Sequence, residues 1–169
     1  MPPASTLTWT FARFDALGVR DLYDALQLRA LVFGVEQHCI YLDPDGVDPL
    51  SAHLIGRDAE GALRAYLRVV DPGVKYAEPS LGRVVTHPEV RGGGLGRVLL
   101  AEGLARCDAA WPGHANRISA QAHLAAFYAG FGYQPVGDSY LEDGIPHLEM
   151  WRPPCPAPRM PMPSHPATA

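Results

Sequence analysis

A glycine-rich junction between a predicted strand and a predicted helix constrains the fold of this chain more than any other feature. Residues 81–86 (LGRVVT) are rich in β-branched side chains and are followed by Pro88, which favours a strand that ends there. Residues 95–110 carry apolar side chains on a broad face, which predicts a helix packed against a sheet. Between them stands the sequence RGGGLGR, residues 91–97. The chain must therefore pass from a strand into a buried helix through a turn with little side-chain bulk.

The same junction has the chemistry of an anion-binding turn. Glycines let a ligand approach the backbone closely, and the first N–H groups of a helix lack internal partners and lie at the positive end of the helix dipole. A phosphate or pyrophosphate fits such a turn. The alternative interpretation is a glycine-rich turn that holds no ligand and simply precedes a surface helix.

Spacing excludes two other kinds of phosphate site. A dinucleotide site needs the pattern Gly-x-Gly-x-x-Gly, but Arg97 or Leu99 stands where the third glycine belongs. A nucleotide P-loop needs Gly-Lys followed by Ser or Thr, whereas Gly96 is followed by Arg97 and Val98.

Apolar periodicity predicts the other helices and strands. A helix is expected over residues 18–33, and a hairpin of two antiparallel strands is expected over residues 52–57 and 63–70. The elements expected after the junction are a strand at 117–121, a short helix at 124–131, and closing strands at 133–136 and 147–151 with a polar loop between them.

Length and charge limit the class of protein. A chain of 169 residues suits one ordinary domain, expected over residues 1–152 and followed by a flexible, proline-rich tail over residues 153–169. The formal net charge of −4 argues against nucleic acid as a partner. The apolar runs are too short for a membrane span and the N-terminus does not resemble a secretory signal, so we expect a cytoplasmic protein with no membrane partner.

Neither the cysteines nor the loop over residues 43–49 (DPDGVDP) predicts a metal site. The three cysteines form an odd set with no close pair, so reduced thiols are expected. Asp43, Asp45 and Asp48 invite a calcium interpretation, but the distal glutamate of a helix-loop-helix site is missing, and a turn-rich loop is preferred. The histidines without metal-ligand spacing are His38, His87, His114 and His123.

Two motifs in this order resemble those of the GNAT superfamily of N-acyltransferases. Residues 91–96 match its R/Q-x-x-G-x-G/A signature, placed between a strand and a long helix. Residues 121–133 resemble its second conserved stretch, in which an asparagine-like residue is followed seven positions later by a tyrosine and then by Gly-Phe. Gln121 stands in place of the usual asparagine, and Tyr133 in place of the usual phenylalanine.

Longer segments resemble the ElaA-like branch of this superfamily, over roughly residues 22–152. The resemblance implies an α/β (α+β) fold with a single domain, in which helices flank a mixed, mostly antiparallel central sheet. It also implies that acyl-CoA binds where a splayed strand meets the glycine turn. The segments that carry this similarity are residues 28–37, 43–49, 120–128 and 140–150.

The resemblance implies a reaction as well. Acetyl-CoA or another acyl-CoA acts as cosubstrate, an amine attacks the thioester directly, and no metal takes part. Tyr128 corresponds to the residue that gives a proton to the departing thiolate; the alternative is an aromatic ring that packs with Leu124 and Phe131. The residues implied to contact CoA are Val84, Val85, Thr86, Arg91, Gly92, Gly93, Gly94, Leu95, Gly96, Arg97, Gln121 and Tyr128.

The acceptor amine needs a base, because an ammonium with a pKa of about 10.4 is only about one part in a few thousand neutral at pH 7. Glu36 ranks first, since it ends the first predicted helix, where members of the superfamily usually bind the acceptor; a solvated carboxylate is the alternative. The other candidate bases are Glu142, Asp143 and His147. Three residues on predicted strands could line the wall of the acceptor pocket, His53, Arg68 and Arg83. The alternative is that they face solvent or make a satisfied hydrogen bond, as a single polar residue on a strand more often does.

Three functions of different classes stay open. One is an N-acetyltransferase that acts on a small-molecule or peptide amine, as a monomer or homodimer. The second is a non-catalytic acyl-CoA-binding or regulatory module, and the third is a scaffold domain whose proline-rich tail recruits a partner. Tyr128 favours the enzyme.

Overall fold

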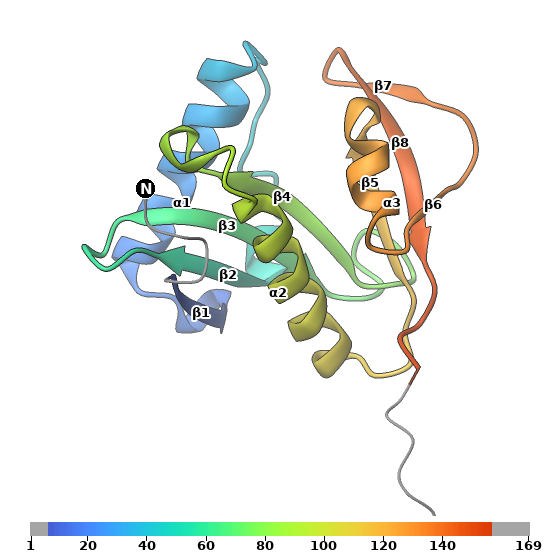
Figure 1. The fold of residues 1–169 in the computed structure, drawn as a ribbon, viewed down its shortest axis with the longest axis horizontal. Helices are drawn as coiled ribbons and strands as arrows, with labels where there is room; N and C mark the ends of the chain where they lie inside the picture. The colour runs from blue at the N-terminus through green and yellow to red at the C-terminus, as the bar shows by residue number, and fades with distance from the viewer. Residues whose placement is uncertain (1–6, 157–169) are drawn as a thin grey trace, which may run out of the picture.

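The computed structural model describes residues 7–156, whose strands form two four-stranded sheets (Figure 1). The first sheet has the order β1-β2-β3-β4, and in the second β8 lies between β5 and β6 and also pairs with β7. Every strand pairing in this described range is antiparallel. The strands are β1 Thr8–Arg13, β2 Ser51–Arg57, β3 Leu63–Val70, β4 Ser80–Thr86, β5 Asn116–Gln121, β6 Gln134–Pro135, β7 Tyr140–Glu142 and β8 Ile145–Arg152; the helices are α1 Val19–Arg29, α2 Leu95–Ala110 and α3 Ala125–Ala129.

Most of the predicted elements are confirmed, including the β2–β3 hairpin, the passage from β4 into α2 and the order β5, α3, β8. The expected tail falls mainly on residues 157–169, which lie outside the described residues, whereas residues 153–156 follow β8 without regular structure. Within the described range no helix is both long and apolar enough to cross a membrane.

The structure differs from the prediction at β1, at β7 and at the end of the first helix. Strand β1, an edge strand, was missed although Trp9 and Phe11 alternate with Thr8 and Thr10 and pack against the core. Strand β7 occupies three residues of the expected polar loop. The first helix changes at Ala30 into a π-helical turn over Ala30–Glu36, closed by a bond from the Gln37 N–H to the Val32 carbonyl at 3.0 Å, and apolar periodicity carries no signal for that wider turn.

Helices α1 and α2 cover opposite faces of the first sheet (Figure 1). Successive side chains of β2 point to opposite faces of the sheet, so Ile55 packs with α1 while Leu54 belongs to the core under α2. Helix α2 approaches the sheet closely at Gly103, where an added Cβ would lie 2.6 Å from Leu67 Cδ2.

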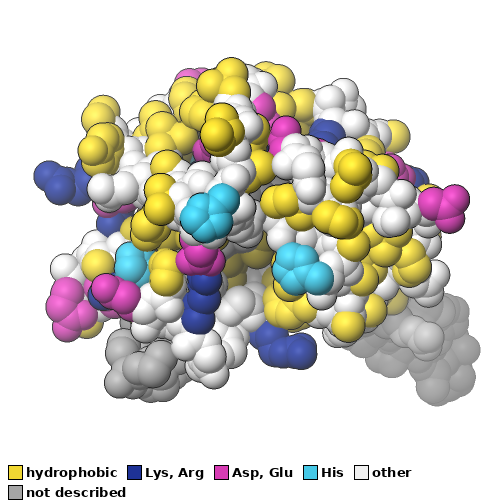
Figure 2. All heavy atoms as spheres, turned by 90° about the horizontal axis from the view of Figure 1, so that it is seen from above, with side chains coloured by type: hydrophobic (Ala, Val, Ile, Leu, Met, Phe, Trp, Pro, Cys, Tyr) yellow, Lys and Arg dark blue, Asp and Glu magenta, His cyan; other side chains and the backbone are white. Residues whose placement is uncertain are grey.

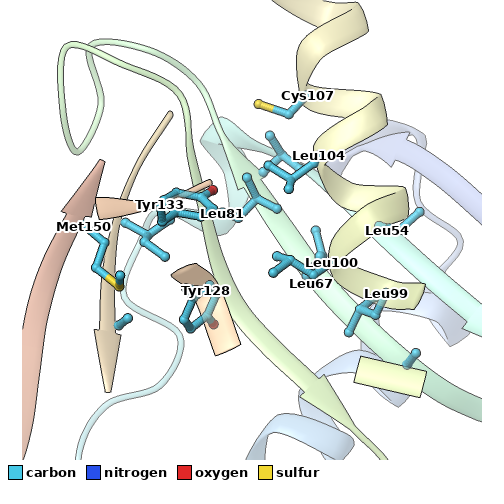
Figure 3. Close-up of a cluster of buried hydrophobic side chains, with 14 of the residues drawn as sticks. Leu54, Leu67, Leu81, Leu99, Leu100, Leu104, Cys107, Tyr128, Tyr133 and Met150 are labelled. Atoms are coloured by element: carbon cyan, nitrogen blue, oxygen red, sulfur yellow. The ribbon is translucent and has the colours of Figure 1, made fainter. Parts of the chain in front are cut away.

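One hydrophobic core joins the two sheets. Leucines of α2 and of the first sheet share it with side chains from the second half of the chain, among them Tyr128, Tyr133 and Met150 (Figure 3). Tyr133 is only 2% exposed and packs edge-on against Tyr128. The strand predicted at 133–136 is shorter in the structure, as β6, although the Val136 N–H still donates to the Glu149 carbonyl of β8 at 2.8 Å. The shared core fixes how the two sheets stand to each other. Hydrophobic side chains also cover much of the face seen from above Figure 1 (Figure 2).

Each aspartate of the loop at 43–49 forms ion pairs with two arginines. We call this set of six the arginine–aspartate ring, because each aspartate bridges two arginines: its links are Arg29–Asp48 (2.9 Å), Asp48–Arg68 (2.9 Å), Arg68–Asp45 (2.7 Å), Asp45–Arg83 (3.3 Å), Arg83–Asp43 (2.7 Å) and Asp43–Arg29 (2.9 Å). The loop is therefore tied to α1, β3 and β4 by ion pairs. Because arginines bind its carboxylates, the calcium interpretation of the loop is wrong.

Candidate active site

Strands β4 and β5 begin side by side and then separate. At their start the Arg117 N–H donates to the Pro79 carbonyl at 3.2 Å. Farther along, residues 81–86 of β4 and residues 118–121 of β5 line the same cavity, whose volume is about 430 Å³. The seam between the two sheets therefore opens into a pocket with a β-strand along each wall.

A bulge in β4 disturbs its pairing with β3 at this pocket. Val85 lies opposite Tyr66 and Gly82 opposite Arg68, so two residues of β4, Arg83 and Val84, face one residue of β3. Arg83 adopts a φ of 53°, in the left-handed region that few side chains favour. The bulge changes the direction of the β4 backbone at the point where β4 lines the cavity.

The glycine turn has the geometry expected of an anion site. Gly92 and Gly94 adopt φ values of 85° and 81°, which glycine tolerates best, and Gly94 is the N-cap of α2 without a side-chain cap bond. Of the turn, Arg91 and Gly96 line the cavity. Leu95 is 5% exposed and packs in the core, so any ligand contact there comes from its backbone. Arg97 lies over the ring of Phe127, 5.7 Å from its centroid.

Tyr128 of α3 belongs to both the core and the cavity wall. It is 7% exposed and packs edge-on against Tyr133, with ring centroids 5.9 Å apart (Figure 3). It also packs edge-on against Phe127, whose ring centroid is 5.2 Å away. Burial raises the pKa of Tyr128 to about 12. The phenol therefore stays protonated at neutral pH and is available as a hydrogen-bond donor inside the cavity.

The sequence between the start of β2 and the end of β8 matches a known family. A family model described as "Acetyltransferase (GNAT) domain" covers residues 51–152. The chain belongs to the GNAT family. The family and fold that the two motifs predicted are thereby confirmed, and the open seam beside the glycine turn belongs to a GNAT domain.

Similar proteins match this GNAT chain over most of its length. A UPF0039 protein of Synechocystis is 44% identical over 144 residues, which are 85% of this chain and 94% of the relative. The ElaA protein of Escherichia coli is 38% identical over 148 residues, 86% of this chain and 96% of its own. The crystal structure of an acyl-CoA N-acyltransferase from Pseudomonas aeruginosa has a TM-score of 0.83 at 41% identity, and that of E. coli ElaA has 0.81 at 38%; each match covers 87% of this chain and 99% of the other.

Residues 36–39, which we call the bridging segment, connect the two walls of the GNAT pocket. Its contacts are Glu36 with Arg91 of the glycine turn (2.6 Å), Gln37 with Gln121 of β5 (3.1 Å) and the Cys39 thiol with the Asp143 carbonyl (3.2 Å). The Glu36 carboxylate thus lies in an ion pair with the glycine turn. It is less available as a base than its position in the sequence suggested.

Polar side chains of β5, β7 and β8 gather on the opposite wall. Ser119 Oγ donates to Glu142 Oε2 at 2.8 Å, and His147 Nε2 lies 3.8 Å from the same oxygen. All three side chains line the cavity. Asp143, at the exposed turn between β7 and β8, has a φ of 51° and also lines it. The structure therefore brings three of the four candidate bases to this wall and leaves Glu36 on the other side.

Two of the three residues considered for the acceptor wall, His53 and Arg68, do not line the cavity but are buried and hydrogen-bonded elsewhere. His53 is 1% exposed, with its ring nitrogens bonded to the Tyr66 hydroxyl (2.8 Å) and the Asp48 carbonyl (3.0 Å). Arg68 is 2% exposed and belongs to the arginine–aspartate ring. Arg83 does line the cavity. The prediction missed Ser119, which the alternation of β5 places on the same face as Gln121.

Proposed function

We propose that this GNAT chain is an N-acyltransferase that uses an acyl-CoA, in the first place acetyl-CoA, to acylate a primary amine of a small molecule or peptide. The observation that carries the proposal is that the glycine turn, the bulged edge of β4 and Tyr128 border one cavity. The pyrophosphate of an acyl-CoA requires an anion site, which the glycine turn would supply. Its extended arm requires a strand edge, which β4 would supply, and its thioester requires a proton donor, which Tyr128 would supply.

The residues of the turn fit a pyrophosphate. A Cβ built on any glycine of residues 92–94 would have no heavy atom within 4 Å, so the space before this backbone is open. The N–H groups of Leu95 and Gly96 precede the first hydrogen bonds of α2, which end on the Gly94 carbonyl. Residues 84–86 and Gln121 are proposed to lie along the arm of the ligand. When bound, acyl-CoA would supply the activated acyl group.

Tyr128 is proposed to act on the leaving group. Because burial keeps its phenol neutral, Tyr128 can donate a hydrogen bond to sulfur as negative charge develops there. The backbone of the β4 bulge is proposed to face the thioester carbonyl, where an N–H would stabilise the oxyanion.

Turnover tests the proposal directly. The protein is incubated with acetyl-CoA and a panel of primary amines, and the release of free thiol is followed together with the mass of the amine product. We expect thiol release that depends on the amine and matches acetylated product one to one. Binding of acetyl-CoA without turnover of any amine would instead support the non-catalytic binding module.

Replacing Gly94 by valine should weaken CoA binding at least tenfold. A valine at a φ of 81° is strained, and its side chain would enter the open space in front of the turn. The measurement is the dissociation constant of CoA by calorimetry.

Gly113 provides the matched control at the other end of α2. It has a φ of 77°, is exposed, and an added Cβ there would also have no atom within 4 Å. Gly113→Val should cost a similar, small amount of stability, since a left-handed residue with a side chain costs about 1–2 kcal/mol. It should leave CoA affinity unchanged. Equal affinities of the two variants for CoA would remove the glycine turn from the proposed site.

A further inference from the structure

We propose that His147 accepts the proton of the acceptor amine, with Glu142 and Ser119 as its positioning residues. This inference rests on the proposed N-acyl transfer and assigns its base. His147 stands on β8, opposite Gln121 of β5 and Tyr140 of β7, so neighbouring strands hold it on both sides. Its side chain is 14% exposed and lines the cavity, as Tyr128 does.

A hydrogen bond fixes which nitrogen of His147 is free. Nδ1 lies 2.8 Å from the Ile145 carbonyl oxygen, and because a carbonyl only accepts, Nδ1 carries the hydrogen. In the neutral imidazole Nε2 then holds the lone pair. Tyr140 stacks on the same imidazole, with ring centroids 6.2 Å apart and planes 26° apart, and so restrains its orientation.

A carboxylate stands beside the free nitrogen. Glu142 Oε2 is 3.8 Å from Nε2, close enough to stabilise an imidazolium once the proton has arrived. Ser119 donates to that oxygen at 2.8 Å, and its own oxygen lies 2.5 Å from the Tyr140 hydroxyl. Since the hydrogen of Ser119 is used, Tyr140 is the donor of that second bond. The chain Tyr140, Ser119, Glu142 therefore ends on a carboxylate held next to His147.

Three other carboxylates have different surroundings. Glu36 is bonded to Arg91 at 2.6 Å, so protonating its carboxylate would break an ion pair. Asp143 is exposed on its turn. Glu149, which follows His147 on the same face of β8, is held by Arg117 at 2.5 Å. Among these groups His147 alone combines a free lone pair, partial burial and an adjacent negative charge.

The proton and electron count closes with these residues. An ammonium gives one proton to Nε2, and the freed nitrogen pair forms the C–N bond to the thioester carbon. The C–S bond then breaks and its electron pair leaves on sulfur, where the developing thiolate accepts a hydrogen bond from Tyr128. The nitrogen of the product loses its second proton to water, water supplies a proton to the thiolate, and the imidazolium releases the first proton to solvent.

The test exploits a difference between acceptors. A base is required for an alkylamine, which is protonated at neutral pH. It is required much less for an O-alkylhydroxylamine analogue of the same size, because oxygen beside the nitrogen keeps that amine neutral at pH 7. The alkylamine that the wild type turns over best and its neutral analogue are compared at pH 7, and the alkylamine is measured again at pH 9.

His147→Gln should lower kcat/KM for the alkylamine by about a hundredfold at pH 7, the lower end of general-base effects. The loss should be less than threefold for the neutral analogue, and it should shrink at pH 9, where more of the alkylamine is neutral. Glu142→Gln should show the same pattern with a smaller loss, because it removes only the charge.

His114→Gln is the matched control. His114 also directs Nδ1 to a carbonyl two residues earlier, that of Pro112 at 3.3 Å, but it is exposed and stands outside the cavity. This variant should keep wild-type kinetics. Equal losses for His147→Gln at both pH values would make His147 a structural residue, and unchanged kinetics would place the base elsewhere. If the wild type acylates no amine at all, the proposed function fails before the base is tested.

Discussion

Replacing Asp48 by asparagine is expected to lower the free energy of unfolding by about 3 to 5 kcal/mol, the usual cost of breaking a buried ion pair on one side. Asp48 Oδ1 accepts hydrogen bonds from Arg29 and Arg68, both at 2.9 Å, and the side chains of these arginines are 0% and 3% exposed. The amide has nearly the shape of the carboxylate but not its charge. Two buried guanidinium groups would then share one negative group fewer. Urea or thermal unfolding of both proteins measures the difference, which should appear as a fall of roughly 6 to 20 °C in Tm.

Asp71→Asn is the control for this change. Asp71 also bonds an arginine through both oxygens, but that partner, Arg13, is 52% exposed. Exposed pairs contribute about 0 to 1 kcal/mol, so this variant should unfold close to the wild type. A similar loss in both variants would show that burial of the arginine–aspartate ring adds nothing.

Acid should weaken the ring. Burial opposes ionisation of Asp48, yet the hydrogen bonds and charges of Arg29 and Arg68 outweigh it and hold the pKa of Asp48 below its usual value. The pKa of Asp45 is lowered in the same way, with burial again opposed chiefly by Arg68. A folded pKa below the unfolded value of about 3.9 gives stability that is complete above about pH 4 and lost as pH falls toward the folded pKa. The wild type should therefore lose stability below pH 4 more steeply than Asp48→Asn.

Tyr128→Phe should lower kcat by tens to hundreds of fold and change CoA affinity by less than tenfold. A phenol with a pKa of about 12 is a weaker acid than a thiol near 8.5, so complete transfer to a free thiolate is uphill by about 5 kcal/mol. Its contribution is therefore a hydrogen bond to developing charge, at the low end of general-acid effects. The ring, and with it the packing on Phe127 and Tyr133, is kept. Steady-state kinetics with acetyl-CoA and the best amine measure the effect.

Tyr133→Phe separates chemistry from packing. Tyr133 touches Tyr128 in the same core, but its hydroxyl donates to Asn116 Oδ1 at 2.5 Å. Its loss leaves a buried acceptor without a partner, so we expect about 1–3 kcal/mol less stability and a nearly wild-type kcat. The expected pattern is thus reversed between the two tyrosines. A Tyr128→Phe protein with the wild-type rate would make Tyr128 a packing residue.

The sequence predicted the elements that have local signals. Strand β4, the glycine turn and α2 follow from a β-branched run, from glycines at positive φ and from an apolar face, all read within a few residues. The resemblance to a family predicted the role of Tyr128 and the parts of the chain that would contact CoA. Strand β1 was overlooked, although its aromatic side chains Trp9 and Phe11 alternate with threonines and face the core.

Contacts between distant segments explain the remaining differences. The loop aspartates looked like turn residues or calcium ligands because their partners, Arg68 and Arg83, lie 20 to 40 residues away in the chain. Glu36 was ranked first as a base, although Arg91, which pairs with it, stands 55 residues farther on. Spacing within one helix or strand carries no information about such partners.

The arginine–aspartate ring also bears on how this chain can change over generations. Each of the six side chains pairs with two others, so a substitution at one position disturbs two neighbours. A protein with that single substitution carries an unpaired charge in its interior. Replacement of all six side chains by apolar ones of similar volume need not destabilise the fold, but no route of single steps leads there without passing through such an intermediate. We therefore expect the six residues of the ring, which lie on α1, β3, β4 and the loop at 43–49, to change together during evolution rather than one at a time.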